Sequence, residues 1–444
     1  MANRYKKIVI LGMGFAGAHA AIQLSERMKD RAEITVVDIN NYHLFKPMLH
    51  EFATGGVEAG HIMQPIRHIL RGRHVSFVPG IVQAIDTSRR LVHLCKDCIV
   101  CHRQDICPIK DFNLTIEDIE RNGESVLAYD YLILTLGGIP NFYDIEGSRE
   151  YAFPINDLKD ADRIRNHILH AFAIAEMVRE TEKRRQILTF AIVGAGPTGL
   201  ETANELHEWI YKALSKEFTE IHPKEIRICL IEAGRDILPA SPADVRRSAK
   251  KYLLEKRISL LTEAPVIRVG KDFLETKKGL MTTFTVIWAA GIRGHTLFKD
   301  AGFSVDSFGR VMVDPYLSAM GYDQVYALGD CSSYTPPGDV HPLPQTAQVA
   351  VQEALYLARS LPAVFEGAPV EPFKYRALGS AISAGQYKGF VSLLGLFRLQ
   401  GFAGWMAWKF TYLKHLIGIR LSARSLLEWL SDLTYDREAT RHKF

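Results

Sequence analysis

The chain has 444 residues, a length that predicts two or three domains rather than one. Hydrophobic residues make up 47% of it and charged residues 23%, which excludes a largely disordered or collagen-like chain. The formal net charge is only +4, so the composition does not predict a nucleic-acid-binding protein. We find no uncharged apolar run long enough to span a membrane and no cleavage pattern after the N-terminal basic residues, and we therefore expect neither a spanning helix nor a signal peptide.

Two segments of the chain repeat one pattern, in which a short apolar run leads into Gly-x-Gly-x-x-Gly, a helix-like stretch, and a second apolar run ending in an acid. The first segment runs from Lys7 to Asp38 and the second from Phe190 to Glu232. These are the elements of a dinucleotide-binding βαβ unit: the glycines admit a pyrophosphate to the helix N-terminus, and the acid accepts hydrogen bonds from the ribose. The predicted phosphate-binding glycines are Gly12, Gly14 and Gly17 in the first segment and Gly194, Gly196 and Gly199 in the second.

Three further apolar runs end in small residues or an acid, at 131–137, 286–291 and 325–330. Small residues at a strand end let the backbone pass close to a cofactor, and Asp330 could bind a ribityl chain. Since the second nucleotide unit lies between the first and last of these runs, we expect an NAD domain inserted into a discontinuous FAD domain. The predicted fold is α/β, with two Rossmann-like dinucleotide-binding domains, for FAD and NADH, and a C-terminal membrane-associating helical region. The expected bounds are 1–155 and 301–375 for the FAD domain, 156–300 for the NADH domain and 376–444 for the C-terminal region.

Over nearly its whole length the chain resembles the type II NADH dehydrogenases, single-subunit NADH:quinone oxidoreductases of the two-dinucleotide-binding-domain flavoproteins. The most specific match is Ala347-Gln-Val-Ala-Val-Gln352, which is similar to the family's Ala-Gln-x-Ala-x-Gln quinone-site motif. The other matching stretches are Asn41–His50, Ile192–Glu201, Trp288–Gly294, Ala327–Cys331 and Gly401–Trp408. The chain departs from the family at Lys46, where Gln is common, and at Ser383–Gly385, which replaces a bulkier stretch, so no quinone preference is implied.

The resemblance implies an FAD-dependent, non-proton-pumping NADH:quinone oxidoreductase, in which hydride passes from NADH to flavin N5 and two electrons then reach a membrane quinone. Its catalytic residues would be Glu201, Gln348 and Gln352. Besides the glycines of the first segment, the implied FAD contacts are Asp38, Lys46, Pro47, Val82, Thr135, Gly137, Gly329, Asp330 and Ala347. Besides those of the second segment, the NADH contacts would be Glu232, Ala290 and Gly291. A carboxylate at Glu232 would repel a 2′-phosphate and so favour NADH over NADPH.

The C-terminal region from Phe390 is rich in aromatic and aliphatic residues interspersed with basic ones. The apolar residues that recur at helix-like spacing are Phe402, Trp405, Met406, Leu413, Leu416 and Ile417. Such segments can lie in a membrane interface, although a dimer interface or an ordinary core helix would show the same pattern. We therefore predict a peripheral, monotopic protein on the cytoplasmic face of the membrane, and the resemblance implies a homodimer.

An insertion near 95–107 carries Cys95, Cys98, Cys101 and Cys107, which are spaced C-x2-C-x2-C-x5-C. Four thiolates this close can enclose a tetrahedral metal, and we predict zinc ahead of an iron–sulfur cluster, with His93 and His102 as possible substitute ligands. A redox disulfide and unligated loop thiols are the alternatives. Usual members of the family lack this insertion, so the resemblance does not decide among them.

Two other functions remain open on the same fold. The protein could pass electrons to a thiol or sulfur acceptor through the cysteines, although disulfide reductases carry a cysteine pair after the first βαβ acid and residues 40–80 contain none. Alternatively, it could be a slow-turnover NADH or redox sensor that signals through the same cysteines. Rapid quinone turnover would argue against a sensor.

Overall fold

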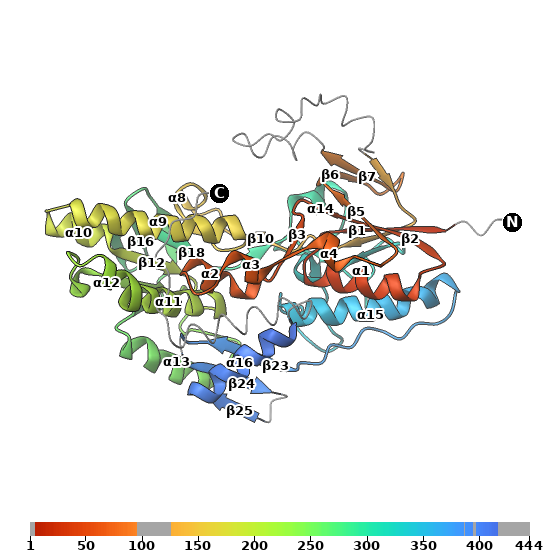
Figure 1. The fold of residues 1–444 in the computed structure, drawn as a ribbon. Helices are drawn as coiled ribbons and strands as arrows, with labels where there is room; N and C mark the ends of the chain where they lie inside the picture. Colours follow the sequence, from red (N-terminus) through yellow and green to blue (C-terminus); the bar gives the residue numbers. More distant parts are fainter. Residues whose placement is uncertain (1–4, 96–125, 386, 394–396, 416–444) are drawn as a thin grey trace. The chain divides into compact units, whose positions relative to one another are not determined.

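The computed structural model describes residues 5–95, 126–385, 387–393 and 397–415 (Figure 1). The chain forms two compact units that alternate along the sequence. The first unit comprises 1–43, 64–139 and 292–376, and the second comprises 44–63, 140–291 and 377–444. The domain bounds expected at 155, 300 and 375 stay predictions, while the compact units change over at 139/140, 291/292 and 376/377.

The first unit contains a five-stranded parallel sheet in the order β21-β9-β1-β2-β5. Its strands are β1 (Lys6–Leu11), β2 (Ala32–Asp38), β5 (Val75–Pro79), β9 (Tyr131–Leu134) and β21 (Val325–Ala327). Ile8–Leu11 are all buried, as expected for a parallel strand covered on both faces. Helices α1 (Phe15–Arg27) and α15 (Ala347–Phe365) pack against each other (Figure 1). The smaller elements include β6 (Ile81–Asp86), β7 (Leu91–Cys95) and β8 (Val126–Ala128), which form an antiparallel sheet, α4 (Ile66–Ile69), α14 (Thr296–Asp300) and the 3-10 turn η4 (Gly329–Cys331).

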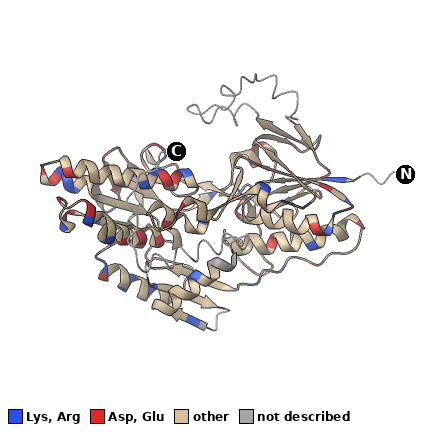
Figure 2. Cartoon of the chain, in the orientation of Figure 1, with Lys and Arg blue, Asp and Glu red and all other residues tan. Residues whose placement is uncertain are grey.

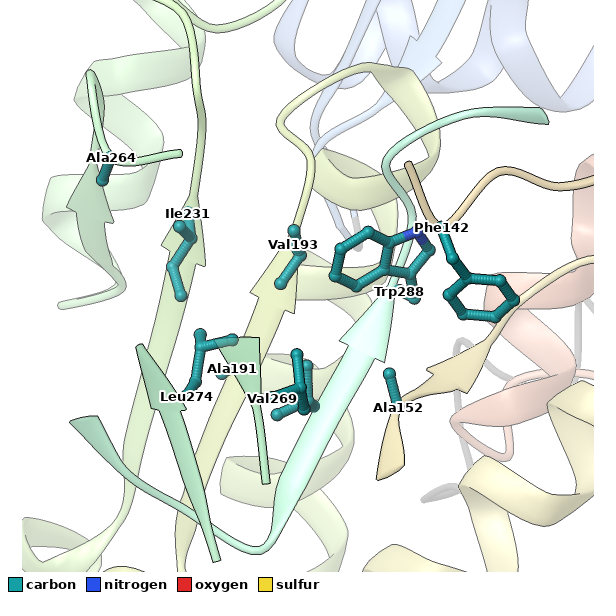
Figure 3. Close-up of a cluster of buried hydrophobic side chains, with 10 residues drawn as sticks. Phe142, Ala152, Ala191, Val193, Ile231, Ala264, Val269, Leu274 and Trp288 are labelled. Carbon is teal, nitrogen blue, oxygen red and sulfur yellow. The ribbon is translucent and has the colours of Figure 1, made fainter. Parts of the chain in front are cut away.

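The second unit contains a five-stranded parallel sheet in the order β11-β18-β12-β13-β14. Its strands are β11 (Phe153–Pro154), β12 (Thr189–Val193), β13 (Arg227–Ile231), β14 (Ser259–Leu261) and β18 (Thr285–Trp288). An antiparallel sheet of β15 (Val266–Val269), β16 (Phe273–Thr276) and β17 (Gly279–Thr282) contributes to the same core. Figure 3 shows Val269 and Leu274 from this sheet among buried side chains of β12, β13 and β18, with Phe142 beside Trp288.

Among the described residues of the second unit, charged side chains are concentrated on the helices, while the parallel strands carry few (Figure 2). The long helices are α9 (Leu158–Met177), α11 (Pro197–Trp209) and α13 (Ala243–Glu255), and the short ones are α2 (Leu49–Ala53), α3 (Ala59–Ile62), α8 (Ser148–Tyr151), α10 (Thr181–Ile187) and α12 (Ser215–Glu217). Helix α2 lies far from the others in sequence, yet it packs against α9 and α11.

The C-terminal part of the second unit begins with strands, which the predicted helical region did not include. Strands β23 (Gly379–Ser383), β24 (Gly389–Leu393) and β25 (Phe397–Gln400) form an antiparallel sheet, followed by α16 (Gly401–His415). One face of α13 holds this sheet. Asp244 forms an ion pair with Arg398 at 3.0 Å, and Ser248 donates a hydrogen bond to the side chain of Gln400 at 3.1 Å. One turn on, the ring of Tyr252 stacks on Phe390, and Glu255 forms an ion pair with Lys388 at 2.9 Å. Among the described residues, no helix is long and apolar enough to cross a membrane.

Candidate functional site

The first glycine loop, Gly12–Gly17, connects β1 to α1. Gly12 has φ +102°, and a Cβ there would collide with the carbonyl oxygen of Thr135. The backbone N–H of Met13 donates to Asp38 Oδ2 at 2.6 Å, and that of Asn40 donates to Oδ1 at 2.8 Å. A Cβ on Gly14 would meet no atom of the described residues within 4 Å. Hydrogen bonds therefore fix the first part of the loop, while the space beside Gly14 is unfilled. This space leaves room for a phosphate at the N-terminus of α1.

His43 is buried next to the first glycine loop, and the sequence did not predict it as a site residue. Its Nδ1 lies 2.8 Å from the carbonyl oxygen of Met13. Burial lowers the pKa of His43 to about 4, so the ring is neutral and Nδ1 must carry the hydrogen that the carbonyl accepts. Nε2 is then an acceptor, and it is buried without a hydrogen-bond partner among the described residues. A buried acceptor beside the loop fits a ligand that offers a hydroxyl or amine donor.

The turn η4 carries Gly329 and Asp330 and is fixed by neighbouring helices of the first unit. A Cβ on Gly329 would approach Ala350 to 3.2 Å, and Gln345 Nε2 donates to the Asp330 carbonyl at 2.7 Å. Glu353, fully buried on α15, accepts the Gly329 N–H at 2.5 Å, and burial raises its pKa to about 8. The turn that presents Asp330 is thus clamped to the helix that carries the two motif glutamines.

The second loop, Gly194–Gly199, repeats the first. Gly194 has φ +99°, and its Cβ would lie 2.5 Å from the Ala289 carbonyl oxygen, while Gly196 is open. The N–H groups of Ala195 and Gly234 each donate to one oxygen of Glu232 at 2.8 Å. The neighbouring carbonyl oxygens of Ala290 and Gly291 accept hydrogen bonds from Tyr143 and Asn141. The predicted NADH residues therefore gather at the carboxyl ends of β12, β13 and β18.

Glu201 lies in the first turns of α11 and is buried. Its Oε1 accepts the backbone N–H of Ser383 at 3.0 Å, and His50 Nδ1 lies 3.8 Å from Oε2. Desolvation is the largest cause that raises the pKa of Glu201, to about 8, so the carboxyl is mostly protonated near pH 7. A buried ion pair lies nearby in the same unit, between Lys409 of α16 and Glu51 of α2, at 3.1 Å. Neither His50 nor this pair was predicted, because α2 and α16 are remote in sequence.

Gln348 and Gln352 lie on α15, as predicted, and both contact the segment that follows the helix. The hydroxyl of Tyr375 donates to Gln348 Oε1 at 2.9 Å. Gln352 pairs with the backbone of Arg376 at both ends of its amide: Nε2 donates to the carbonyl at 2.9 Å, and Oε1 accepts the N–H at 3.1 Å. Their contact with a quinone stays a prediction.

The remaining predicted FAD contacts divide between the units. Thr135 donates through Oγ1 to the carbonyls of Leu11 and Gly12, both at 2.9 Å, and so shapes the first loop. Val82, Gly137 and Ala347 also belong to the first unit, whereas Lys46 and Pro47, in a 3-10 turn at Lys46–Met48, belong to the second. Lys46 Nζ lies 3.3 Å from Asn156 Oδ1 of that unit.

Comparison with known proteins agrees with this geometry. Residues 6–354 match the family model described as pyridine nucleotide-disulphide oxidoreductase. The chain belongs to this family. A curated relative from Mycobacterium tuberculosis, named type II NADH:quinone oxidoreductase Ndh, is 30% identical over 440 residues, covering 96% of this chain and 88% of the relative. A Staphylococcus aureus type II NADH:quinone oxidoreductase is 28% identical, with 89% and 91% covered. Within the family, the chain therefore belongs with the type II NADH:quinone oxidoreductases.

Solved structures show the same fold. NDH2 from Plasmodium falciparum in complex with NADH matches with a TM-score of 0.84 at 21% identity, covering 98% of this chain and all of that one. The sulfide:quinone oxidoreductase from Aquifex aeolicus gives a TM-score of 0.72 at 16% identity, with 98% and 96% covered. At these identities the likeness establishes the fold alone, and it confirms the predicted α/β class with two Rossmann-like domains.

The cysteine insertion of this type II oxidoreductase lies largely outside the described residues. Cys95 ends β7, and its sulfur is disulfide-bonded, the redox alternative to a metal ligand. Cys98, Cys101, Cys107 and His102 are not among the residues that the structure describes. Within the described ranges, no group of three or more His, Cys, Asp or Glu could hold a metal ion.

Cys331 and Cys229 are buried free thiols. Burial raises the pKa of both, that of Cys331 to about 12, so at neutral pH both are protonated packing residues rather than nucleophiles.

Proposed function

We propose that the protein is an FAD-dependent NADH:quinone oxidoreductase that does not pump protons. One observation carries the proposal: each unit holds a glycine loop whose N–H is bonded to the acid after the next strand, Asp38 in one and Glu232 in the other. Two nucleotide sites of this kind suit one resident and one exchangeable nucleotide, and the named relatives are oxidoreductases that use NADH and quinone.

The first loop would hold FAD. Its open space at Gly14 and the N-terminus of α1 suit the pyrophosphate, and the carboxylate of Asp38 lies at the same loop, where it could accept hydrogen bonds from ribose hydroxyls. Nε2 of His43 could accept a further donor, and Asp330 could bind the ribityl chain. When bound, FAD supplies a two-electron carrier between NADH and the acceptor. We also propose Lys46, Pro47, Val82, Gly137 and Ala347 as contacts.

The second loop would hold NADH, with Glu232 accepting hydrogen bonds from the ribose and disfavouring a 2′-phosphate. Gly196 leaves the space for the pyrophosphate, and the backbone at Ala290 and Gly291 passes beside the site. Glu201, mostly protonated near neutral pH, could position the nicotinamide or hold a proton at its carboxyl group.

The anaerobic half-reactions test this function. The protein, purified with lipid, should have its flavin bleached quickly by NADH, and a ubiquinone or menaquinone analogue should then restore the colour quickly. Absence of bleaching would overturn the NADH assignment. Bleaching without recovery would move the acceptor away from quinone and make the cysteines the leading candidates.

We also propose monotopic attachment to the cytoplasmic face of the membrane through α16. Phe402, Met406 and Phe410 share one helix face and are 59%, 50% and 71% exposed. Trp405, which was expected beside them, is buried together with Trp408 and Lys409. Changing all three exposed residues to Ser should abolish co-flotation with anionic vesicles and leave NADH bleaching intact. Undiminished flotation would contradict the assignment. The homodimer is proposed on the resemblance alone.

For the cysteine insertion we propose an accessory role, as a redox disulfide at Cys95, with the predicted zinc or iron–sulfur site as the alternative. Metal analysis and thiol titration of purified protein separate the alternatives: bound zinc with four protected thiols supports the metal, whereas metal-free protein with fewer free thiols than cysteines supports a redox disulfide. If Ser at Cys95, Cys98, Cys101 and Cys107 leaves NADH:quinone turnover unchanged, electron transfer through the cysteines is excluded.

A further inference from the structure

Tyr143 contacts the carboxyl end of β18 in the second unit, in a backbone conformation that few side chains adopt. Its φ is +52°, in the left-handed region, and the next residue, Asp144, has φ +53°. Aspartate tolerates this region, whereas a bulky residue there is an outlier. Such outliers persist where the surrounding structure holds them, and they gather at ligand sites, so this conformation points to a functional constraint at Tyr143.

Hydrogen bonds of neighbouring residues already hold the segment before Tyr143. The backbone N–H of Asn141 donates to the carbonyl of Gly291 at 3.0 Å, and Trp288 Nε1 donates to the carbonyl of Asn141 at 2.8 Å. The side chain of Asn141 accepts the N–H of Tyr143 at 3.0 Å. These bonds fix the backbone against β18, while Tyr143 stays 51% exposed, so burial of its ring adds little to stability.

The hydroxyl of Tyr143 reaches the predicted NADH residues. It donates to the carbonyl of Ala290 at 2.9 Å, and a Cβ on Gly291 would lie 3.3 Å from its oxygen. Partial burial raises the pKa of Tyr143, and the charge of Glu232 raises it further, so the hydroxyl keeps its hydrogen at neutral pH. The ring is therefore anchored at its hydroxyl end, beside Gly291 and within the electrostatic field of Glu232.

Strand order places this anchor on one side of the second glycine loop. Strand β12, which leads into the loop, lies between β13, which leads to Glu232, and β18, which leads to Ala290. Ala290 also adjoins the loop directly, because a Cβ on Gly194 would lie 2.8 Å from its Cα. A dinucleotide bound across such a crevice has its pyrophosphate at the loop and its adenosine ribose at the acid, so its nicotinamide half extends toward β18.

We infer that Tyr143 is an NADH-binding residue whose ring packs beside the nicotinamide half of the dinucleotide. An aromatic ring offers a large contact area, and the hydrogen bond to Ala290 fixes its position before the ligand arrives. This inference rests on the proposed NADH:quinone function. It adds a residue that the sequence did not predict, because Tyr143 lies outside both glycine motifs.

The test compares Tyr143→Phe and Tyr143→Ala with Tyr211→Phe. Tyr211 also donates its hydroxyl to a backbone carbonyl of the second unit, that of Pro223 at 3.4 Å, but it follows the end of α11 that is remote from the glycine loop. Titration calorimetry measures NAD⁺ binding to the oxidised, flavin-loaded full chain without turnover. Tyr143→Phe should raise the Kd about threefold to tenfold and Tyr143→Ala about tenfold or more, whereas Tyr211→Phe should keep the wild-type value.

ADP binding and NADH kinetics provide two further readouts. ADP is the part of NAD⁺ that the loop and Glu232 would bind, so its Kd should stay at the wild-type value in every variant. In the steady state, Tyr143→Ala should raise the KM for NADH and leave kcat near the wild-type value. Reoxidation of the reduced flavin by a soluble ubiquinone analogue should be unchanged.

Tyr143→Gly separates the ring from the backbone strain. Glycine adopts φ +52° freely, so this variant relieves the strain that Tyr143→Ala retains. Tyr143→Gly should therefore melt at least as high as Tyr143→Ala. Because both variants lack the ring, they should weaken NAD⁺ binding equally.

A wild-type Kd for NAD⁺ in Tyr143→Ala would overturn the inference and leave the proposed function intact. Equal weakening of ADP and NAD⁺ binding, or recovery of NAD⁺ binding in Tyr143→Gly, would also overturn it. A wild type whose flavin is not bleached by NADH would overturn the proposed function itself.

Discussion

The two glycine loops share the same backbone hydrogen bonds to an acid but differ in the groups that bind the rest of the loop. In each loop, the residue after the first glycine donates its N–H to the acid that ends the next strand, at 2.6 Å to Asp38 and 2.8 Å to Glu232. In each, a second N–H two residues after the acid binds its other oxygen. The hydrogen-bond donor to the carbonyl of that same loop residue differs between the loops. The carbonyl of Met13 accepts from the ring of His43, whereas the carbonyl of Ala195 accepts from the backbone N–H of Leu238 at 2.9 Å.

The helices after the loops differ more. Two residues after the last glycine, α1 carries His19, which bonds to the carbonyl of Phe15 in its own helix at 2.9 Å. The equivalent residue of α11 is Glu201, which is buried and bonded to Ser383 of the C-terminal sheet. The loop geometry is therefore shared, whereas the residue two positions after it is a histidine bonded within its own helix in the first unit and a buried carboxyl bonded to the C-terminal sheet in the second.

The largest expected effect comes from the first glycine of each loop. Ala at Gly12 or Gly194 would force a side chain into φ near +100° and against a carbonyl, at a cost of about 1–3 kcal/mol, or about fivefold to 150-fold in affinity. Gly12→Ala should be purified with little flavin, whereas Gly194→Ala should keep its flavin and bleach slowly with NADH.

Gly14→Ala and Gly196→Ala serve as controls, because in the part of the chain that the structure describes no atom lies within 4 Å of the added Cβ. Both should keep the wild-type melting temperature of the flavin-free protein and should lose only nucleotide affinity. Loss of flavin from Gly194→Ala would show that the two loops are not independent.

The acids should come next. Asp38→Asn and Glu232→Gln each turn a double acceptor into a group that offers a donor to a backbone N–H, which costs about 1.5–3 kcal/mol. Asp38→Asn should release flavin. Glu232→Gln should raise the KM for NADH about tenfold or more, and it should reduce the ratio of kcat/KM for NADH to that for NADPH. Asp236→Asn, at a half-buried acid paired with Lys250, should change neither the flavin content nor the KM for NADH. An unchanged NADPH ratio in Glu232→Gln would refute the role of its charge.

The pH dependence of stability tests the buried carboxyl of α11, which has no counterpart on α1. Glu201 has a pKa of about 8 when folded and an ordinary one, near 4.5, when unfolded, so the folded state keeps an extra proton between these values. Its contribution to stability therefore falls as pH rises from about 4.5 to 8 and is constant above that range. Glu201→Gln should flatten this slope and raise the melting temperature above pH 8 by a few degrees, at about 2–4 °C per kcal/mol.

Some slope should remain in Glu201→Gln, because Glu353 shifts in the same direction. A wild-type slope in Glu201→Gln would show that this carboxyl is already ionised below pH 8.

The smallest effect is expected at His43. Its hydrogen bond to the Met13 carbonyl is a neutral one, worth about 1 kcal/mol, so His43→Gln should speed flavin release about fivefold. The pKa of His43 is about 4 when folded, so its contribution to stability falls as pH drops from about 6.5 to 4, and the variant should be less acid-sensitive.

His167 is the matched control for His43, since burial also lowers its pKa to about 4 and it bonds to Thr285 in the second unit. His167→Gln should alter acid stability without speeding flavin release. Equal flavin release from the two variants would remove His43 from the flavin site.

The sequence predicted the parts of the molecule that depend on local spacing. Both loops, their acids and the strand before Asp330 follow from glycine spacing and apolar runs. The role proposed for His43 depends on side-chain contacts that no spacing specifies, and the placement of 44–63 in the second unit depends on packing between remote segments. Glu353 had a detectable signal, because it occupies the apolar face of α15 with Val349, Ala350 and Leu357, where an acid is out of place.

The order of the strands bears on how the protein is made. Every strand of the second parallel sheet lies between Phe153 and Trp288, whereas the first sheet uses strands from Lys6 to Ala327. During synthesis on the ribosome, the sheet of the second unit can therefore be completed before the sheet of the first unit. The edge of β9 stays unpaired until β21 has been synthesised. During this interval the nascent first unit exposes an unpaired strand edge, which can pair with another chain and would benefit from chaperone protection.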